Sequence, residues 1–569
     1  MLLDLLGSVV LFFMLAFGLA WPLASRLALP PTEKLVATAA LSLLGIFVFG
    51  WVVYVFALSP GCLWLLPVLA IAGLAAGRRP FAVLARDRET RGLFGAHLLV
   101  TLWCLGWLAT IGSYSGGGWA GDWFEHWERT RFFLERWPLE TKILASYLLP
   151  ARPPLANVVT GVFLRLSQID FAHFQLVSTL LASLVFLPAA LCARRWGGAR
   201  AVPVLAVLFM LNPLFVQNAT FAWTKLPAAF FVLAALWFFL RAHDADAPPA
   251  AGAGCGGLLA AGLLTHYSAG PYIVVLALWW LVLGRSRWRS GEWRRQTAFA
   301  AVAGAIVLAL WFGWSVLAYG ARGTFLSNSS VTSEHVRHGS QLAKIALNIL
   351  DTLVPHFLRP MDAALIEQRS ALGWWRDWFF QSYQLNLPLG FGSVAWLALG
   401  GELVRAGRAA AVHARVFWTI FAAGTVALGL AVHGARDHWG LAHICLQPLV
   451  LLGLAFLAAR WAALSRAWRL ALIAGATVDF TLGIALHFAM QNFAVARWLT
   501  GAGSTEAAFA DFNSSAIMNF AGKIHHRLAF FGDIFAAAPM LVSAGVAAIF
   551  LLALARARAA ARRHLQPPL

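Results

Sequence analysis

Residues 121–155 read GDWFEHWERTRFFLERWPLETKILASYLLPARPPL, a charged and aromatic-rich connection between two apolar stretches. The rest of the chain is mostly compatible with a lipid bilayer. Of its 569 residues, 60% are hydrophobic and 12% are charged, whereas a soluble domain carries about 25% charged residues. Apolar runs of about 20 residues recur and predict helices that cross a hydrocarbon core about 30 Å thick. The sequence therefore predicts an all-α polytopic membrane protein.

We expect about 15 membrane-crossing helices, with amphipathic helices lying in the membrane interface within the outer loops. The spans are expected near residues 5–25, 35–57, 61–77, 94–113, 173–193, 201–218, 226–240, 255–265, 270–284, 297–319, 386–403, 416–433, 441–459, 470–488 and 537–555.

Basic residues are concentrated in alternate loops. One set of loops contains 26 Lys and Arg but only 7 Asp and Glu, and the other contains 17 and 15. The positive-inside rule places the first set in the cytoplasm, so the N-terminus is expected outside and the C-terminus inside. The three long loops 114–172, 320–385 and 491–536 then face outward. Membrane orientation and anionic lipids thus explain the formal charge of +19, and nucleic acid is not expected as a partner.

The loops also suggest a division of the chain into four regions. Residues 1–93 form an N-terminal extension of three spans, and residues 94–320 form a catalytic transmembrane core that includes the outer loop 114–172. Residues 321–385 form a second outer loop. Residues 386–569 contain the C-terminal spans and the outer loop 491–536.

The first outer loop contains the strongest candidate site. Residues 122–137 have the pattern of an interfacial amphipathic helix, with Glu125 and Arg129 spaced i,i+4 on its polar side. Asp122 follows a glycine-rich run, and a carboxylate there can act as a general base toward an acceptor hydroxyl. Asp122 and Glu125 equally fit a helix N-cap and its N3 partner. Both interpretations stay open at this point.

Two basic residues extend this candidate site. Arg152 precedes two prolines, which force it into an extended conformation at a bend and favour a helix start after it. Its planar guanidinium suits a phosphate, although a snorkelling arginine on ordinary lipid headgroups is an equal alternative. Lys225 lies in a short turn on the same outer side, where it could join Arg152 around a phosphate or remain an interfacial lysine.

These residues resemble those of the GT-C glycosyltransferases, and in particular protein O-mannosyltransferases and the aminoarabinose transferase of lipid A. The resemblance includes an acid after the span before the first large outer loop, an aromatic helix, and the RPPL sequence at Arg152–Leu155. It also includes LNPLF at residues 211–215, Thr224-Lys225 and the short hairpin AGLLTHYS at residues 261–268. It covers residues 94–320 well. The sequence departs from the family at Trp123, where a second acid is common, and at His266, where lysine is common.

The resemblance implies an inverting transfer of a sugar from a polyprenyl-phosphate donor to an acceptor hydroxyl on the outer face of the membrane. The acceptor could be a glycolipid, a polysaccharide or a protein. By the same resemblance Asp122 is the loop acid, Glu125 could replace the missing second acid, and Arg152 and Lys225 hold the phosphate. We add His266 and Arg436 as candidate substrate-binding residues.

Other site types have weaker support. The histidines around Arg436 are spaced by five residues, which does not align ligands on one helix, so a metal is possible but not supported. The five cysteines show no CxxC pair and predict neither a disulfide framework nor a thiolate site. The sequence identifies no cofactor.

Two other functions compete with glycosyl transfer. A lipid-linked oligosaccharide ligase or polymerase would share the outer loops and the donor. A transporter is less favoured, because the spans of transporters usually contain charged residues that serve the function. The spans predicted here are nearly free of charge, with Asp479 as the clear exception. The composition favours a bacterial inner membrane.

Overall fold

The computed structural model describes residues 2–111, 121–144, 147–244, 247–248, 250–327, 340–354, 389–433 and 446–488, together with residue 555. Throughout these ranges the chain is helical and forms no β-strand, with a single bridge between Ile143 and Tyr147. The all-α prediction is confirmed.

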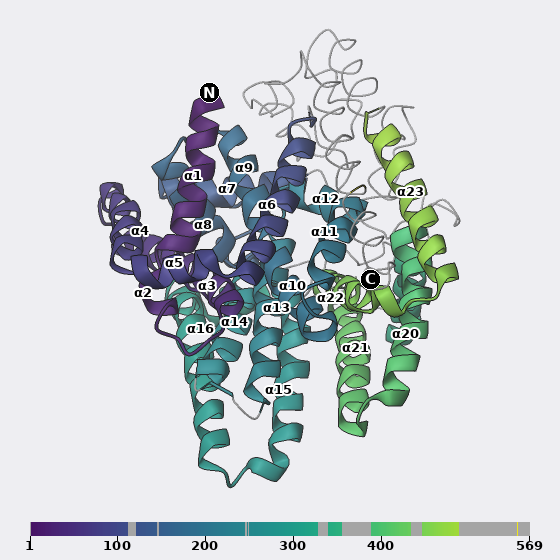
Figure 1. Ribbon diagram of the computed structural model, residues 1–569. Coiled ribbons are helices and arrows are strands. Elements are labelled where there is room, and N and C mark those ends of the chain that lie inside the picture. Colours follow the sequence, from purple (N-terminus) through teal and green to yellow (C-terminus); the bar gives the residue numbers. More distant parts are fainter. Residues whose placement is uncertain are drawn as a thin grey trace.

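The longer helices follow the order of the predicted spans (Figure 1). In the first part of the chain they are α1 (Leu2–Gly18), α3 (Pro31–Val55), α4 (Leu65–Ala76), α5 (Arg78–Arg86), α6 (Arg88–Leu108), α7 (Gly121–Glu135), α8 (Leu155–Leu166), α9 (Phe171–Ser183), α10 (Phe186–Gly197), α11 (Ala201–Leu211), α12 (Pro213–Thr220) and α13 (Lys225–Ala242). They continue with α14 (Ala250–Thr265), α15 (Gly270–Gly284), α16 (Gly291–Leu326), α18 (Gln341–Leu353), α20 (Ala395–Ala409), α21 (Val412–His433), α22 (Gln447–Arg460) and α23 (Arg466–Phe488).

Shorter elements connect these helices. They are α2 (Trp21–Ala24), the 3-10 turns η1 (Pro60–Trp64), η2 (Leu149–Ala151), η3 (Tyr267–Ala269), η4 (Arg285–Arg287) and η10 (Trp461–Ala463), and the π-helix η9 (Leu389–Val394).

Many of these helices are long and apolar enough to cross a membrane. Among the described residues nine satisfy this criterion, or up to eleven when each of two bent pairs is one span. The polytopic prediction is confirmed, and the count of 15 stays a prediction because span 537–555 lies outside the described residues.

One expected span has a different shape. Residues 201–218 form α11 and α12, which meet at an angle of 69°. Pro213 has no N–H to continue α11, and the side-chain oxygen of Asn212 accepts a hydrogen bond from the N–H of Leu214 at 3.1 Å. The LNPLF sequence is therefore a helix break with its own N-cap.

The three N-terminal spans share one hydrophobic core with the rest of the chain. Helix α1 packs on α9, and α3 packs on α8. On α3, Trp51 donates its indole N–H to the carbonyl of Leu310 in α16 at 2.8 Å and lies against Trp311 and Trp314. Helix α3 thus supports α16, which lies after residues 114–172 in the sequence. The division into four sequence regions stays a proposal.

Helices α14 and α16 approach so closely that glycine is required. A Cβ on Gly252 would meet the carbonyl oxygen of Gln296 at 2.3 Å, and one on Gly256 would meet that of Ala300 at 2.0 Å. The spacing of these glycines is the GxxxG pattern of closely packed membrane helices. A glycine-rich run such as residues 252–257 is typical of a flexible connection in a sequence, but in the structure this segment is a helical packing surface.

We predict that Gly256→Ala will lower the unfolding temperature of the purified protein in detergent. The new methyl group meets backbone of α16, which cannot move aside as a flexible side chain can, and overpacking of this kind costs about 1–3 kcal/mol. Gly313→Ala in α16 is the control, since a Cβ there has open space within 4 Å. Equal melting temperatures for both variants would contradict the packing interpretation.

Candidate active site

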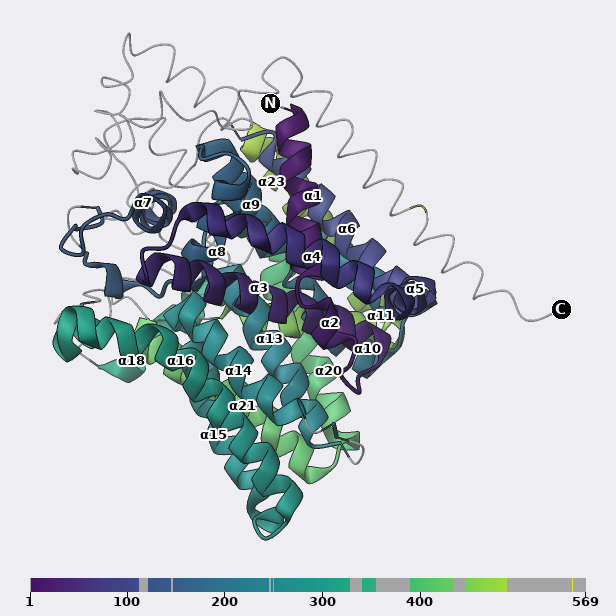
Figure 2. The same cartoon turned by 90° about the vertical axis from the view of Figure 1, so that its left-hand side faces the viewer.

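Helix α7 is fixed in the body of the protein by aromatic contacts with α9. Trp123 lies with its ring centroid 5.1 Å from that of Phe171, and Trp127 lies 5.2 Å from Phe174. Both tryptophans are buried. Figure 2 shows α7 beside α8, with which it makes many contacts. The apolar residues of the predicted amphipathic helix thus pack against α9.

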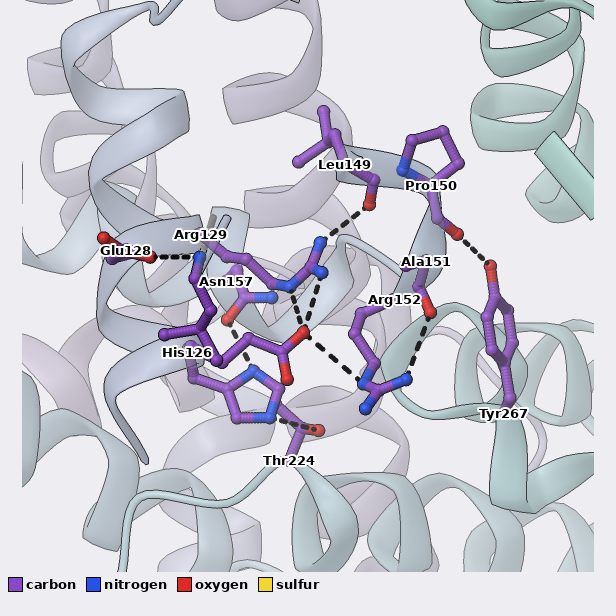
Figure 3. Close-up of polar contacts among 12 residues, drawn as sticks. His126, Glu128, Arg129, Leu149, Pro150, Ala151, Arg152, Asn157, Thr224 and Tyr267 are labelled. Atoms are coloured by element: carbon purple, nitrogen blue, oxygen red, sulfur yellow. Dashed lines mark hydrogen bonds and ion pairs between the residues drawn. The ribbon is translucent and has the colours of Figure 1, made fainter. Parts of the chain in front are cut away.

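The centre of the site is the carboxylate of Glu125. Its neighbours His126, Arg129 and Arg152 are labelled in Figure 3. Oε1 of Glu125 accepts a hydrogen bond from Nε of Arg129 at 2.9 Å and forms an ion pair with Nη2 of the same residue at 2.7 Å. Nε of Arg152 lies 3.6 Å from this oxygen. Glu125 is 2% exposed and Arg129 is 1% exposed, so the polar side of α7 on which the i,i+4 spacing placed them is buried in the protein. The buried guanidinium of Arg129 also donates to the carbonyl of Leu149 at 2.7 Å.

The two guanidinium groups decide the charge of Glu125. Burial raises the pKa of a carboxyl group, but Arg152 and Arg129 lower it by more, and the pKa of Glu125 falls to about 2. Glu125 is consequently ionised at neutral pH and is a poor proton acceptor. Its geometry suits a residue that holds the two arginines in place.

Arg152 has the extended backbone that the following proline predicts, with φ −132° and ψ 148°. Helix α8 begins just after the prolines, at Leu155. The guanidinium lies over the ring of Tyr147 at 5.6 Å and donates to the carbonyl of Ala151 at 3.4 Å. Its side chain remains 17% exposed. Arg152 is therefore oriented by the protein and still reachable.

His126, the neighbour of Glu125, connects α7 with α8 and with the turn before α13. Its Nδ1 lies 3.3 Å from Oδ1 of Asn157, and its Nε2 lies 3.5 Å from Oγ1 of Thr224. The dipeptide Glu125-His126 thus contacts both basic elements, one through Arg152 and the other through the residue before Lys225.

Lys225 is the first residue of α13 and is 5% exposed. Its Nζ lies 3.6 Å from the centroid of the Trp223 ring, a cation–π contact. Ala222 before it has φ +58°, which turns the chain sharply into α13. The pKa of His126 is lowered to about 3, mainly by burial. The negative charge of Glu125 raises this pKa, and the positive charge of Lys225 lowers it further. His126 is therefore neutral beside these cations.

The connection between α7 and η2 is held at two points. The carboxylate of Glu128 accepts a hydrogen bond from the N–H of Leu144 at 2.8 Å. The guanidinium of Arg136 donates to the carbonyls of Val53 at 3.2 Å and Ala57 at 3.4 Å, where α3 ends. A cation at a helix C-terminus is favourable. The N-terminal extension thereby supports the loop that contains Tyr147.

The hairpin between α14 and α15 reaches the site through Tyr267, whose hydroxyl donates to the carbonyl of Pro150 at 3.0 Å. His266 is 9% exposed, and its Nδ1 accepts from the backbone N–H of Ser268 at 3.1 Å. In this position His266 caps η3. Its expected role in substrate binding stays a prediction.

Two predicted site residues cannot be placed. The backbone of Asp122 lies in the first turn of α7, but its side chain is outside the described part of the structure, as is the whole of Arg436. Their roles stay predictions. Within the described ranges, no group of three His, Cys, Asp or Glu side chains could hold a metal ion.

Sequence reasoning missed His126, Asn157 and Tyr267. The available signals were weak: Asn157 is a polar residue within an apolar run five positions after Arg152, and Tyr267 follows His266 in a hairpin that was already of interest. His126 could have been noticed only by its position next to Glu125.

Comparison with known proteins supports the expected resemblance for part of the chain. Residues 151–314 match the family model of dolichyl-phosphate-mannose-protein mannosyltransferases. The matched segment begins one residue before Arg152 and includes Asn157, Thr224, Lys225 and Tyr267. No curated protein matches the chain significantly.

Solved structures of two named proteins also resemble this chain over most of its length. The crystal structure of ArnT from Cupriavidus metallidurans bound to undecaprenyl phosphate has a TM-score of 0.48 and 18% identity, over 81% of this chain and 77% of that chain. The apo oligosaccharyltransferase from Archaeoglobus fulgidus has a TM-score of 0.43 and 14% identity, over 78% and 60%. Both TM-scores are below 0.5, so no function is inferred from these two structures.

We predict that Arg129→Met will strongly destabilise the protein. The substitution removes the closer of the two guanidiniums that stabilise the buried charge of Glu125. Breaking a buried ion pair costs about 3–5 kcal/mol. The matched control is Arg131→Met on the same helix, because Arg131 and Glu135 form an i,i+4 pair that is more than a third exposed. An exposed pair contributes only about 0–1 kcal/mol. Thermal unfolding of both variants in detergent tests this, and a larger loss for Arg131→Met would contradict it.

The pKa of Glu125 predicts the direction of its effect on acid stability. A carboxyl whose folded pKa is lowered contributes stability above its unfolded pKa, and this contribution is lost as pH falls toward the folded pKa. We expect the wild-type unfolding temperature to fall more steeply than that of Glu125→Gln between pH 4.5 and about 2. Thermal scans across this range measure the difference. Parallel curves would show that Glu125 is not held ionised by Arg152 and Arg129.

Proposed function

We propose that the protein is a membrane glycosyltransferase that moves a sugar from a polyprenyl-phosphate donor to an acceptor hydroxyl at the outer face of a bacterial inner membrane. The observation that carries this proposal is that Arg152 and Thr224, the residue before Lys225, both contact the Glu125-His126 dipeptide of the first outer loop. Arg152 and Lys225 both lie within the segment that matches the mannosyltransferase family model.

The cations of the site suit the phosphate of such a donor. Arg129, Arg152 and Lys225 all act electrostatically on His126, and Arg152 is partly exposed. Arg129 is committed to Glu125 and to the carbonyl of Leu149. We assign the phosphate to Arg152, whose side chain is 17% exposed, together with Lys225. A guanidinium can bind a phosphate with two parallel donors.

The reaction is a single displacement at the anomeric carbon. The acceptor oxygen forms a bond to this carbon while the bond between the carbon and the phosphate oxygen breaks, which inverts the configuration. The proton of the acceptor hydroxyl passes to Asp122, the remaining candidate base. The electron pair of the broken bond stays on the polyprenyl phosphate, where Arg152 and Lys225 stabilise the added negative charge.

This proposal changes the role expected for Glu125. With a pKa of about 2 it does not take the proton, and its contacts assign it to holding Arg152. The acceptor class stays open between a glycolipid, a polysaccharide and a protein. The outward orientation of the site follows from the distribution of Lys and Arg among the loops.

We predict that Arg152→Ala and Asp122→Asn will each abolish most transfer by the purified protein from radiolabelled polyprenyl-phosphate sugars. Loss of a group that stabilises developing charge costs about 10²–10³-fold, and loss of a general base costs about 10²–10⁴-fold. Arg165→Ala, at an exposed arginine in α8, the helix that follows Arg152, is the control and should retain activity. Full activity of Asp122→Asn would remove Asp122 as the base. Full activity of Arg152→Ala would contradict the phosphate site.

A further inference from the structure

Helix α5 is a basic helix at a fixed angle to the apolar helix before it. The axes of the 60–76 helical segment and of α5 differ by 75°. If α4 crosses the membrane, α5 therefore lies close to the plane of the membrane surface. Arg78, Arg79 and Arg86 are exposed, whereas Leu84 is buried. At 100° per residue the three arginines share one face, opposite Leu84.

The bend before α5 is built into the packing of the protein. The indole N–H of Trp21 donates to the carbonyl of Gly77 at 2.9 Å, and a Cβ on Gly77 would meet this indole nitrogen at 2.4 Å. Phe81 of α5 lies edge-on to the Trp21 ring, with the centroids 5.7 Å apart. Glycine at residue 77 and tryptophan at residue 21 together fix the direction in which α5 leaves α4.

The other end of α5 is fixed as well. Asp87 caps α6, with its Oδ2 accepting from the N–H of Thr90 at 2.8 Å. In the first turn of α6, Glu89 forms an ion pair with Arg194 of α10, and Arg194 also donates to the hydroxyl of Thr32 at 2.5 Å. The helix is therefore a rigid platform between two anchored ends.

The arginines of α5 are exposed at the surface of the protein. Within the described part of the chain, the side chains of Arg78, Arg79 and Arg86 form neither a hydrogen bond nor an ion pair. The apolar side chains Phe81 and Val83 on the same helix are 40% and 65% exposed. Exposed apolar groups next to unpaired guanidiniums on an in-plane helix match the boundary between acyl chains and headgroups.

We propose that α5 is a docking surface for anionic phospholipids, whose headgroup phosphates are bound by Arg78, Arg79 and Arg86. The charges are complementary, and an in-plane helix with exposed Phe81 and Val83 reaches the depth at which headgroup phosphates lie. Because the platform is rigid, little conformational freedom of the backbone is lost on binding. This proposal is independent of the function proposed above.

The test compares lipid binding by the full chain and by two triple variants in nonionic detergent. Native mass spectrometry measures the affinity for dioctanoyl phosphatidylglycerol and for dioctanoyl phosphatidylcholine. Each basic group near an anionic surface contributes about fivefold, so Arg78→Gln/Arg79→Gln/Arg86→Gln should weaken phosphatidylglycerol binding by about 100-fold. Binding of phosphatidylcholine should not change.

The matched control removes the same number of charges from another exposed basic segment. In Arg285→Gln/Arg287→Gln/Arg289→Gln the arginines come from a short turn and its flank, and we expect a loss of less than tenfold. A third variant, Arg78→Lys/Arg79→Lys/Arg86→Lys, keeps the positive charge and should keep most of the phosphatidylglycerol binding. The proposal is overturned if the wild type does not prefer phosphatidylglycerol, or if both glutamine triples lose binding equally.

Discussion

The candidate site depends on one buried carboxylate, that of Glu125, placed between the guanidiniums of Arg129 and Arg152. A buried ion is costly unless it is paired and hydrogen-bonded. Here the pairing links three segments, because Arg129 lies on α7 and also donates to the carbonyl of Leu149 in η2, while Arg152 precedes α8. The charge of Glu125 therefore fixes both the loop and the basic residue that we assign to the phosphate.

The surrounding helices make that arrangement rigid. Tyr267 brings the hairpin between α14 and α15 to the carbonyl of Pro150, and α14 itself is held against α16 by close backbone contact at Gly252 and Gly256. On the opposite side, Arg136 attaches the loop to the end of α3. The close packing of α14 on α16 and the contact of Arg136 with α3 therefore fix the position of the loop backbone around Arg152.

Positive charge has two different uses in this protein. In the site, Arg129 and Arg152 are partnered within the fold and oriented by it. On α5, the three arginines are exposed and are presented by a bend that Trp21 and Gly77 define. The arginines of the site and those of α5 differ in their burial and in their contacts within the fold, which a count of basic residues does not reveal. The total charge of +19 alone would have suggested a single kind of partner.

The sequence by itself determined the helical membrane class, since apolar runs of this length have few alternatives. It also determined the extended backbone at Arg152, because proline restricts the residue before it. Only the tertiary structure showed that Glu125 and Arg129 are buried, since i,i+4 spacing gives their common face but not what covers it. The same holds for His126, Asn157 and Tyr267, which meet the site through contacts between segments 31 to 117 residues apart. The apparent linker 252–257 became a packing surface for the same reason, because glycine permits both flexibility and close approach, and only the neighbouring helix decides between them.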